Sequence, residues 1–230
     1  MPLTGFFLDS GATLLYLHHG TPVEVMMAAD TNVRTHEDAF RDSKLCKELF
    51  SRYFEGDTWT QLQEMIQHYE KVETNLAAYS AVYRYGKQGN AFSDPGVGEH
   101  TMYWDTCFRI LFLHEWKLVA GIAFHPEAQM LTIWQIQGLP GKHAQLSVLW
   151  WQRLLVAFLM SVVRSVGYYE EVRILPARRL PSYPIEYRDD PQTKKDLRTR
   201  LTTHYDGTAR SLGFVYDDEM RVWRSRLRAG

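Results

Sequence analysis

The strongest alternation of hydrophobic and polar positions lies in the second half of the chain, where three β-rich segments follow one another. Residues 108–114 and 118–124 are apolar runs separated by the short polar stretch 115–117, a pattern that predicts a hairpin. Residues 131–137 form a third strand, which stops at the glycines of residues 138–141. Its alternation predicts that four side chains share one face, namely Leu131, Ile133, Gln135 and Gln137.

A long apolar helix is predicted directly after this third strand. Residues 144–165 are hydrophobic around most of a helical circumference, which is typical of a helix in the centre of a domain. Gly167 ends the helix, and residues 171–175 return as a strand. Strand, helix and strand in this order form a βαβ unit, so we expect residues 131–137 and 171–175 to pair in parallel.

The end of the chain predicts one more helix and a closing hairpin. Residues 201–212 are helical in pattern, with Gly213 at the position after the last turn. Residues 214–216 and 220–224 then read as two strands joined by an acidic turn. The irregular segment 176–193, which carries several prolines, predicts a functional flap or a surface crossing.

The first hundred residues predict a hairpin followed by a helical pair. Short strands are expected at residues 12–17 and 22–27. One helix is expected over residues 37–54, and a second begins at Thr58 or Thr60 and continues towards Tyr85. The glycine-rich residues that follow, 87–99, are expected to form a loop.

Composition narrows the class of protein without naming a function. With 230 residues and 45% hydrophobic content we expect one domain over 1–230, with the hairpin and helical pair in 1–100 and the sheet core in 101–230. A net charge of −1 does not favour nucleic acid or an anionic membrane. The two cysteines show no CxxC or metal-ligand spacing, and neither a leader nor a bilayer-spanning run is present, so we expect a cytoplasmic protein without metal.

The order of elements over residues 105–225 resembles the GNAT acetyltransferase superfamily, which binds acetyl-coenzyme A. Gln135 and Gly138 match the first two fixed positions of that family's pyrophosphate loop, whereas Pro140 stands at the last and Gly141 follows one residue late. The resemblance implies a mixed α+β fold with a GNAT-like central mixed sheet, flanking helices and an enlarged N-terminal helical pair. In this reading the early hairpin and helices supply the family's first strand and helical pair.

The resemblance also implies an acyl-CoA-dependent N-acyltransferase, most simply an N-acetyltransferase, that acts on an amine of a small molecule or a protein. A free backbone N–H at the end of strand 131–137 would stabilise the developing oxyanion. Tyr205 lies one turn before Ala209, where the family often carries a tyrosine that protonates the departing thiolate. His204 is the candidate base. The strand itself has no carboxylate, so Glu115, or alternatively Glu127, is the candidate carboxylate. The implied coenzyme-binding residues are Gln135, Ile136, Gln137, Gly138, Gly141, Lys142 and His143.

Plainer interpretations stay open beside these assignments. The loop after residue 137 also fits an ordinary strand-to-helix turn, and Tyr205 also fits a packed helix edge. Pro140 and Ala209 favour a catalytically silent member of the fold that serves as a binding or interaction module. Arginines near the C-terminus suggest an RNA-associated module as a further alternative, although acidic residues are interspersed among them. A homodimer through the terminal strands is one open oligomeric arrangement.

Overall fold

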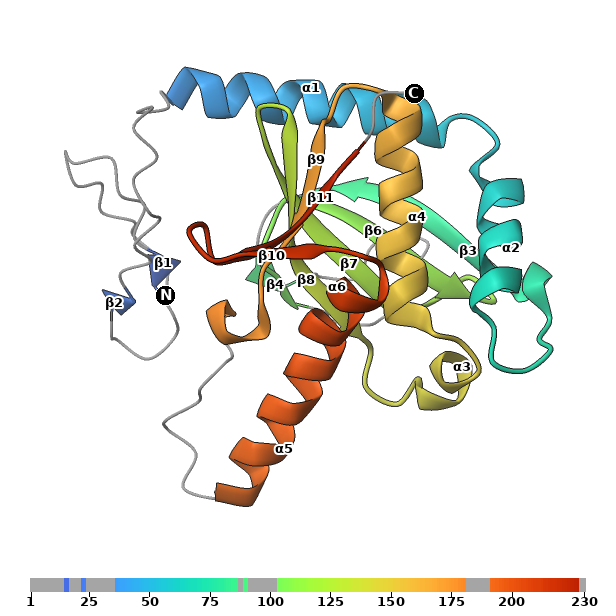
Figure 1. Ribbon diagram of the computed structural model, residues 1–230. Coiled ribbons are helices and arrows are strands. Elements are labelled where there is room, and N and C mark those ends of the chain that lie inside the picture. Colours follow the sequence, from blue (N-terminus) through green and yellow to red (C-terminus); the bar gives the residue numbers. More distant parts are fainter. Residues whose placement is uncertain are drawn as a thin grey trace.

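The computed structural model describes residues 15–16, 22–23, 36–86, 89–90, 103–180 and 191–227 (Figure 1). Its centre is a seven-stranded sheet in the order β10-β11-β9-β8-β7-β6-β3. The strands of this sheet are β3 (Tyr79–Tyr85), β6 (Phe108–His114), β7 (Lys117–Glu127), β8 (Met130–Gly138), β9 (Glu171–Ile174), β10 (Val215–Asp217) and β11 (Val222–Arg226).

The pairing of these strands confirms the predicted mixed sheet. Strands β3, β6, β7 and β8 pair in antiparallel order, and hairpins join β6 to β7 and β7 to β8. Strand β9 pairs with β8 in parallel, and the C-terminal hairpin of β10 and β11 extends the sheet in antiparallel register beyond β9. The mixed α+β fold, a mixed sheet with flanking helices and with two helices ahead of its first strand, is therefore present.

Helices cover one face of this sheet. Figure 1 shows α4 lying across the sheet with α2 beside it, and α1, α2 and α4 share one hydrophobic core with the strands. Gly167, at φ +70°, ends α4 as predicted. The helices are α1 (His36–Phe54), α2 (Thr58–Tyr69), α3 (His143–Ser147), α4 (Trp151–Val166), α5 (Pro191–Thr202) and α6 (Thr208–Ser211). Single turns are η1 (Leu76–Ala78), η2 (Ala177–Arg179) and η3 (Thr203–Gly207), the last of which is π-helical.

The opposite face of the sheet carries a smaller apolar cluster around Trp104. This residue ends β5 (Tyr103–Trp104), which pairs with β4 (Gly89–Asn90), and its ring is almost fully buried. A Cβ added to Gly121 would come within 2.4 Å of the Trp104 ring. The sequence keeps a glycine in the middle of β7 because only a residue without a side chain leaves room for this ring.

Two predictions for the first hundred residues are wrong. Helix α2 ends at Tyr69, and the residues expected to continue it towards Tyr85 form strand β3 instead. Their spacing suits a helix, but pairing with β6 over the whole length of β3 overrides that local pattern. The early hairpin exists as β1 (Leu15–Tyr16) and β2 (Pro22–Val23), yet it forms a separate two-stranded sheet, so β3 and not the hairpin is the first strand of the main sheet.

The long helix predicted over residues 144–165 is interrupted. It appears as the short α3 and the longer α4, separated by residues 148–150. Lys71 N–H donates to the Val148 carbonyl at 2.8 Å, and Trp150 N–H donates to the Tyr69 carbonyl at 2.9 Å. These bonds to the end of α2 take the backbone groups that a continuous helix would use, so the break is a tertiary effect.

The predictions for the C-terminal part hold in outline. Helix α5 begins at Pro191, earlier than predicted, and the helical run ends at Ser211 with Gly213 following at φ +75°. The closing hairpin is present. Most of the expected loop 87–99, the outer parts of the early hairpin strands and residues 181–190 of the irregular segment lie outside the described residues.

Candidate functional site

Strand β8 has two ends with different neighbours. From Met130 to Ile133 it pairs with β9 on one side and with β7 on the other, and we call residues 130–133 the closed end. The last backbone contact across β8 and β9 is the Leu175 N–H, which donates to the Ile133 carbonyl at 3.1 Å. Residues 134–138, here called the open end, pair with β7 alone.

A β-bulge marks the start of the open end. Ala123 of β7 lies opposite Gln135, whereas Phe124 lies opposite Ile133, so Trp134 is the extra residue. Beyond the bulge Ile136 packs into the core under the helices, and Gln135 moves to the other face. The alternation predicted from the sequence, with Gln135 and Gln137 on the face of Ile133, is therefore wrong past residue 133.

Two backbone N–H groups of the open end turn away from β7. The Ile136 N–H donates to the hydroxyl oxygen of Tyr205 at 2.9 Å. The Leu139 N–H donates to the Val119 carbonyl at 2.8 Å, so strand alternation directs the Gly138 N–H to the same side as that of Ile136. No described residue accepts a hydrogen bond from the Gly138 N–H. A free N–H is therefore present at the strand end, where the sequence led us to expect one.

Tyr205 reaches this edge from the π-helical turn η3. Its side chain is only 4% exposed, and its hydroxyl meets β8 at Ile136. Burial raises the pKa of the Tyr205 phenol above its ordinary value, and the nearby charge of Asp105 raises this pKa further. The group is therefore protonated at neutral pH and retains its own proton for donation.

The neighbours of Tyr205 in η3 have separate roles. The His204 ring packs edge-on against Trp151 with 5.8 Å between ring centroids. Burial lowers the pKa of His204, and the charge of Arg200 lowers it further, so the imidazole is neutral at pH 7.

Asp206 anchors the turn. Its Oδ1 accepts from the Trp223 indole N–H at 2.7 Å and from the Ala177 N–H at 3.3 Å. It thus ties η3 to β11 and η2.

Gln135 and Gln137 lie on the face away from the helices, together with a carboxylate that sequence reasoning missed. The backbone N–H of Asp105 donates to Gln135 Oε1 at 3.2 Å, and Gln135 Nε2 donates to Gln137 Oε1. Burial raises the pKa of Asp105. Because Asp105 belongs to no periodic segment and meets Gln135 across thirty positions of sequence, no local signal could have found it.

The loop of residues 138–143 is more closed than an anion-binding turn requires. The Lys142 N–H donates to the Leu139 carbonyl at 3.2 Å, and Pro140 has no N–H. His143 opens only the five-residue α3 instead of the long helix. Gly141, at φ +79°, reverses the chain.

Gly138 serves packing at the start of this loop. A Cβ there would lie 3.1 Å from Leu146 and 3.2 Å from the Trp151 ring. Its small size therefore allows α3 and α4 to approach the end of β8.

Glu115 is not brought to the same place. It lies at the exposed tip of the β6–β7 hairpin, where it has φ +48°. Ile122 of β7 lies opposite Ile136, and Glu115 comes seven residues before Ile122. Glu115 is therefore roughly 20 Å from Ile136 along the strand. The structure groups Tyr205, His204 and the strand residues, and leaves Glu115 outside this group.

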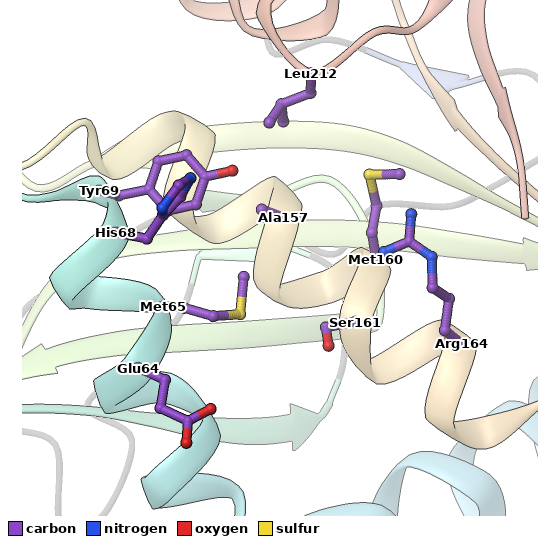
Figure 2. A pocket seen from close by; sticks show the side chains of 9 residues that line it. All are labelled: Glu64, Met65, His68, Tyr69, Ala157, Met160, Ser161, Arg164 and Leu212. Carbon is purple, nitrogen blue, oxygen red and sulfur yellow. The ribbon is translucent and has the colours of Figure 1, made fainter.

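The groove between α2 and α4 is a separate feature (Figure 2). Side chains of both helices, among them Met65 and Met160, face it, and Arg164 lies at one side. Neither Tyr205 nor any residue of β8 lines it. Within the described residues, no helix has both the length and the apolar character needed to cross a bilayer. The same part of the chain holds no cluster of three or more acidic, histidine or cysteine side chains placed to share a metal ion.

Comparison with known proteins does not assign this chain to a family. No protein-family model matches this chain, and no curated protein matches it in sequence. Among solved structures, the chain is similar to the crystal structure of a nourseothricin acetyltransferase, with 13% identity and a TM-score of 0.23. The match covers 48% of this chain and 65% of that enzyme, which is less than two thirds of its length.

Proposed function

We propose that the protein is an acyltransferase that transfers the acyl group of an acyl-CoA thioester, most simply acetyl-CoA, to an amine. One observation carries the proposal: the open end of β8 presents the Gly138 N–H beside the protonated hydroxyl of Tyr205, at the point where β9 has ended. A hydrogen-bond donor for a carbonyl oxygen and a proton donor for a leaving group are thus adjacent on one strand edge.

The chemistry assigns a task to each of these groups. The amine nitrogen attacks the thioester carbonyl carbon, and the Gly138 N–H stabilises the negative charge that develops on the carbonyl oxygen. As the carbon–sulfur bond breaks, the Tyr205 hydroxyl gives its proton to the sulfur. Neutral His204 takes the proton that the amine loses, directly or through water.

Asp105 supports the same proposal from the other face of the sheet. Its charge raises the pKa of Tyr205, so the two groups lie within electrostatic range of each other. A half-buried carboxylate there would favour a cationic acceptor, because an ammonium group is stabilised by a nearby negative charge. Asp105 therefore replaces Glu115 as the candidate carboxylate in our proposal.

Thermal melting with acetyl-CoA tests binding first. A ligand at about 100 times its dissociation constant adds about 2.7 kcal/mol to the free energy of unfolding. Thiol release is then followed with a disulfide reagent in the presence of an aliphatic diamine, an aminoglycoside or a lysine-containing peptide. Absence of any melting shift with acetyl-CoA and with longer acyl-CoA esters would contradict the proposal.

A second candidate is a binding module of the same fold without catalysis. The specific observation behind it is that the Ile136 N–H is already taken by Tyr205, and that the Leu139 and Lys142 N–H groups are bonded within the chain. Fewer backbone donors are then left for a thioester and its phosphates. Acyl-CoA binding without thiol release, across all three amine probes, would favour this second candidate over the enzyme.

A further inference from the structure

A charged cavity lies on the sheet face away from the helices, near the turn between β7 and β8. It holds about 600 Å³ and is lined by residues of that turn and by side chains of β9 and β11. On β9, Glu171 and Arg173 alternate with Val172 and Ile174, which belong to the core under the helices. The two charged residues therefore point to the opposite face, into the cavity.

Most of the charge in this cavity is paired internally. Glu171 accepts hydrogen bonds from Arg173 Nε and from Arg224, whose Nη2 lies 2.6 Å from Glu171 Oε2. Arg224 Nε–H also donates to Glu171 Oε1 at 3.0 Å, and Arg224 Nη1–H donates to Asp217 Oδ2. All three nitrogens of Arg224 are thus used, and this arginine ties β11 to β9 and to β10.

Two guanidinium groups are left with unused donors. Arg173 is only 8% exposed, yet it bonds through Nε alone, and neither of its terminal nitrogens has a partner among the described residues. Arg226 is exposed at the cavity and makes no ion pair within the described part of the chain. The terminal nitrogens of Arg173 are not among the fully buried atoms without a partner, so they reach the open space of the cavity. Two arginines beside one cavity suit an oxyanion with several acceptors.

We propose that this cavity binds an oxyanion, a phosphoryl or carboxylate group, through the terminal nitrogens of Arg173 and the guanidinium of Arg226. Arg226 lies opposite Glu171 in the β9–β11 register, so it is the diagonal neighbour of Arg173. Diagonal neighbours on one face are about 7–8 Å apart at the backbone, a separation that long side chains bridge around a single anion.

The proposed anion site is independent of the acyltransferase proposal. It lies at the level of Met130, six residues along β8 from Ile136, which is roughly 20 Å. It also faces away from the helices, whereas Tyr205 approaches from the helical side. The proposed anion site therefore shares no residue with the proposed acyltransferase site, and its test does not depend on the acyl donor.

The test is a titration of the full chain with sodium phosphate and, separately, sodium succinate, at constant ionic strength held with sodium chloride. We expect a saturable rise in melting temperature and a matching dissociation constant from calorimetry. Phosphate binding alone would identify a phosphoryl ligand, and succinate binding alone a carboxylate. Equal responses to phosphate, succinate and chloride would overturn the proposal.

Three substitutions localise the effect. Arg226→Gln removes an exposed group without a described ion pair, so the protein should fold normally and bind the anion at least tenfold more weakly. Glu170→Gln removes an exposed negative charge at the cavity and should tighten binding about twofold. Arg164→Gln, an exposed arginine on α4 at the other face, is the matched control and should bind as the unaltered protein does. Unchanged affinity in Arg226→Gln would overturn the proposal even if the protein binds phosphate elsewhere.

Discussion

The closed and open ends of β8 show how one strand serves two purposes. At the closed end β8 is hydrogen-bonded on both sides, and the neighbouring strand β9 carries the ion pairs of Glu171. At the open end a single bulge at Trp134 turns the strand, β9 stops, and Tyr205 takes the place of a neighbouring strand. The closed end, which is paired on both sides, therefore holds the free edge of the open end in place. Substitutions at the closed end should then change stability, and those at the open end should change activity.

The largest effect is expected next to the closed end, for Glu171→Gln. The substitution leaves Arg173 and Arg224 without their shared carboxylate, and removal of one member of a buried ion-pair network costs about 3 kcal/mol of unfolding free energy. Urea denaturation followed by circular dichroism measures the loss. Activity per folded molecule should be unchanged, and Asp217→Asn, which removes a more exposed partner of Arg224, should cost less.

The pH dependence of stability sharpens the same contrast. Burial alone would raise the pKa of Glu171, but hydrogen bonds from Arg224 and Arg173 outweigh it, and the pKa in the folded state is lowered. A lowered pKa means that the stabilisation is present above the ordinary carboxyl pKa near 4.5 and is lost as the pH falls below it. The melting temperature of the unaltered protein should fall more steeply between pH 5 and pH 3 than that of Glu171→Gln. Parallel curves would contradict this assignment.

At the open end, Tyr205→Phe should lower the rate of acyl transfer about 100-fold, because the proton donor to the sulfur is lost. The unfolding free energy should fall by only about 1 kcal/mol, through the unpaired Ile136 N–H. Steady-state thiol release measures the first quantity and urea denaturation the second. Tyr83→Phe is the matched control, because the buried Tyr83 hydroxyl has no hydrogen-bond partner among the described residues. An equal loss of transfer rate in Tyr205→Phe and Tyr83→Phe would contradict a role of Tyr205 as the proton donor.

Gly138→Ala should have a smaller effect that touches both properties. The new methyl group would press on Leu146 and the Trp151 ring at 3.1 and 3.2 Å, which costs about 1 kcal/mol of unfolding free energy. Relief of these close contacts would displace the backbone at residue 138 and with it the Gly138 N–H, so the rate of acyl transfer should fall as well. A double variant with Leu146→Ala should show favourable coupling in urea denaturation, since the second change makes room for the first. Simple additivity would mean that the two side chains do not meet.

The smallest effect is expected for Arg200→Gln. The charge of Arg200 contributes to the lowered pKa of His204, so its removal should raise that pKa. If neutral His204 accepts the amine proton, the acidic limb of kcat/KM against pH should move to higher pH in the variant. The profile is measured with the best of the three amine probes. An unmoved limb would exclude His204 as the group that sets it.

The sequence predicted the sheet better than it predicted the site. The hairpin of β6 and β7, the parallel pairing of β8 with β9, and Gly213 after the last helix all follow from local pattern and chirality. Strand β3 was mistaken for helix because its apolar spacing fits both periods, and only its pairing with β6 decides between them. The break before α4 likewise depends on Tyr69 and Lys71, far away in sequence.

The candidate site was predicted in part. Tyr205 lies on the strand edge that the sequence analysis placed beside it, and the Gly138 N–H is the free donor. The bulge at Trp134 could not be predicted, because an alternating pattern gives no sign of one inserted residue. Asp105 and the exclusion of Glu115 depend on where distant segments meet, which local periodicity does not encode.

The π-helical turn η3 makes the direction of Tyr205 depend on the length of the chain. A π turn holds one residue more than the α-helical turn it replaces, and each residue of an α-helix rotates its neighbours by about 100°. Deleting one residue here would let α5 and α6 join as a regular helix, and every side chain on one side of the join would swing around the axis. A family of chains could therefore gain or lose this phenol at β8 by a single-codon insertion or deletion, with no change in any residue of the sheet.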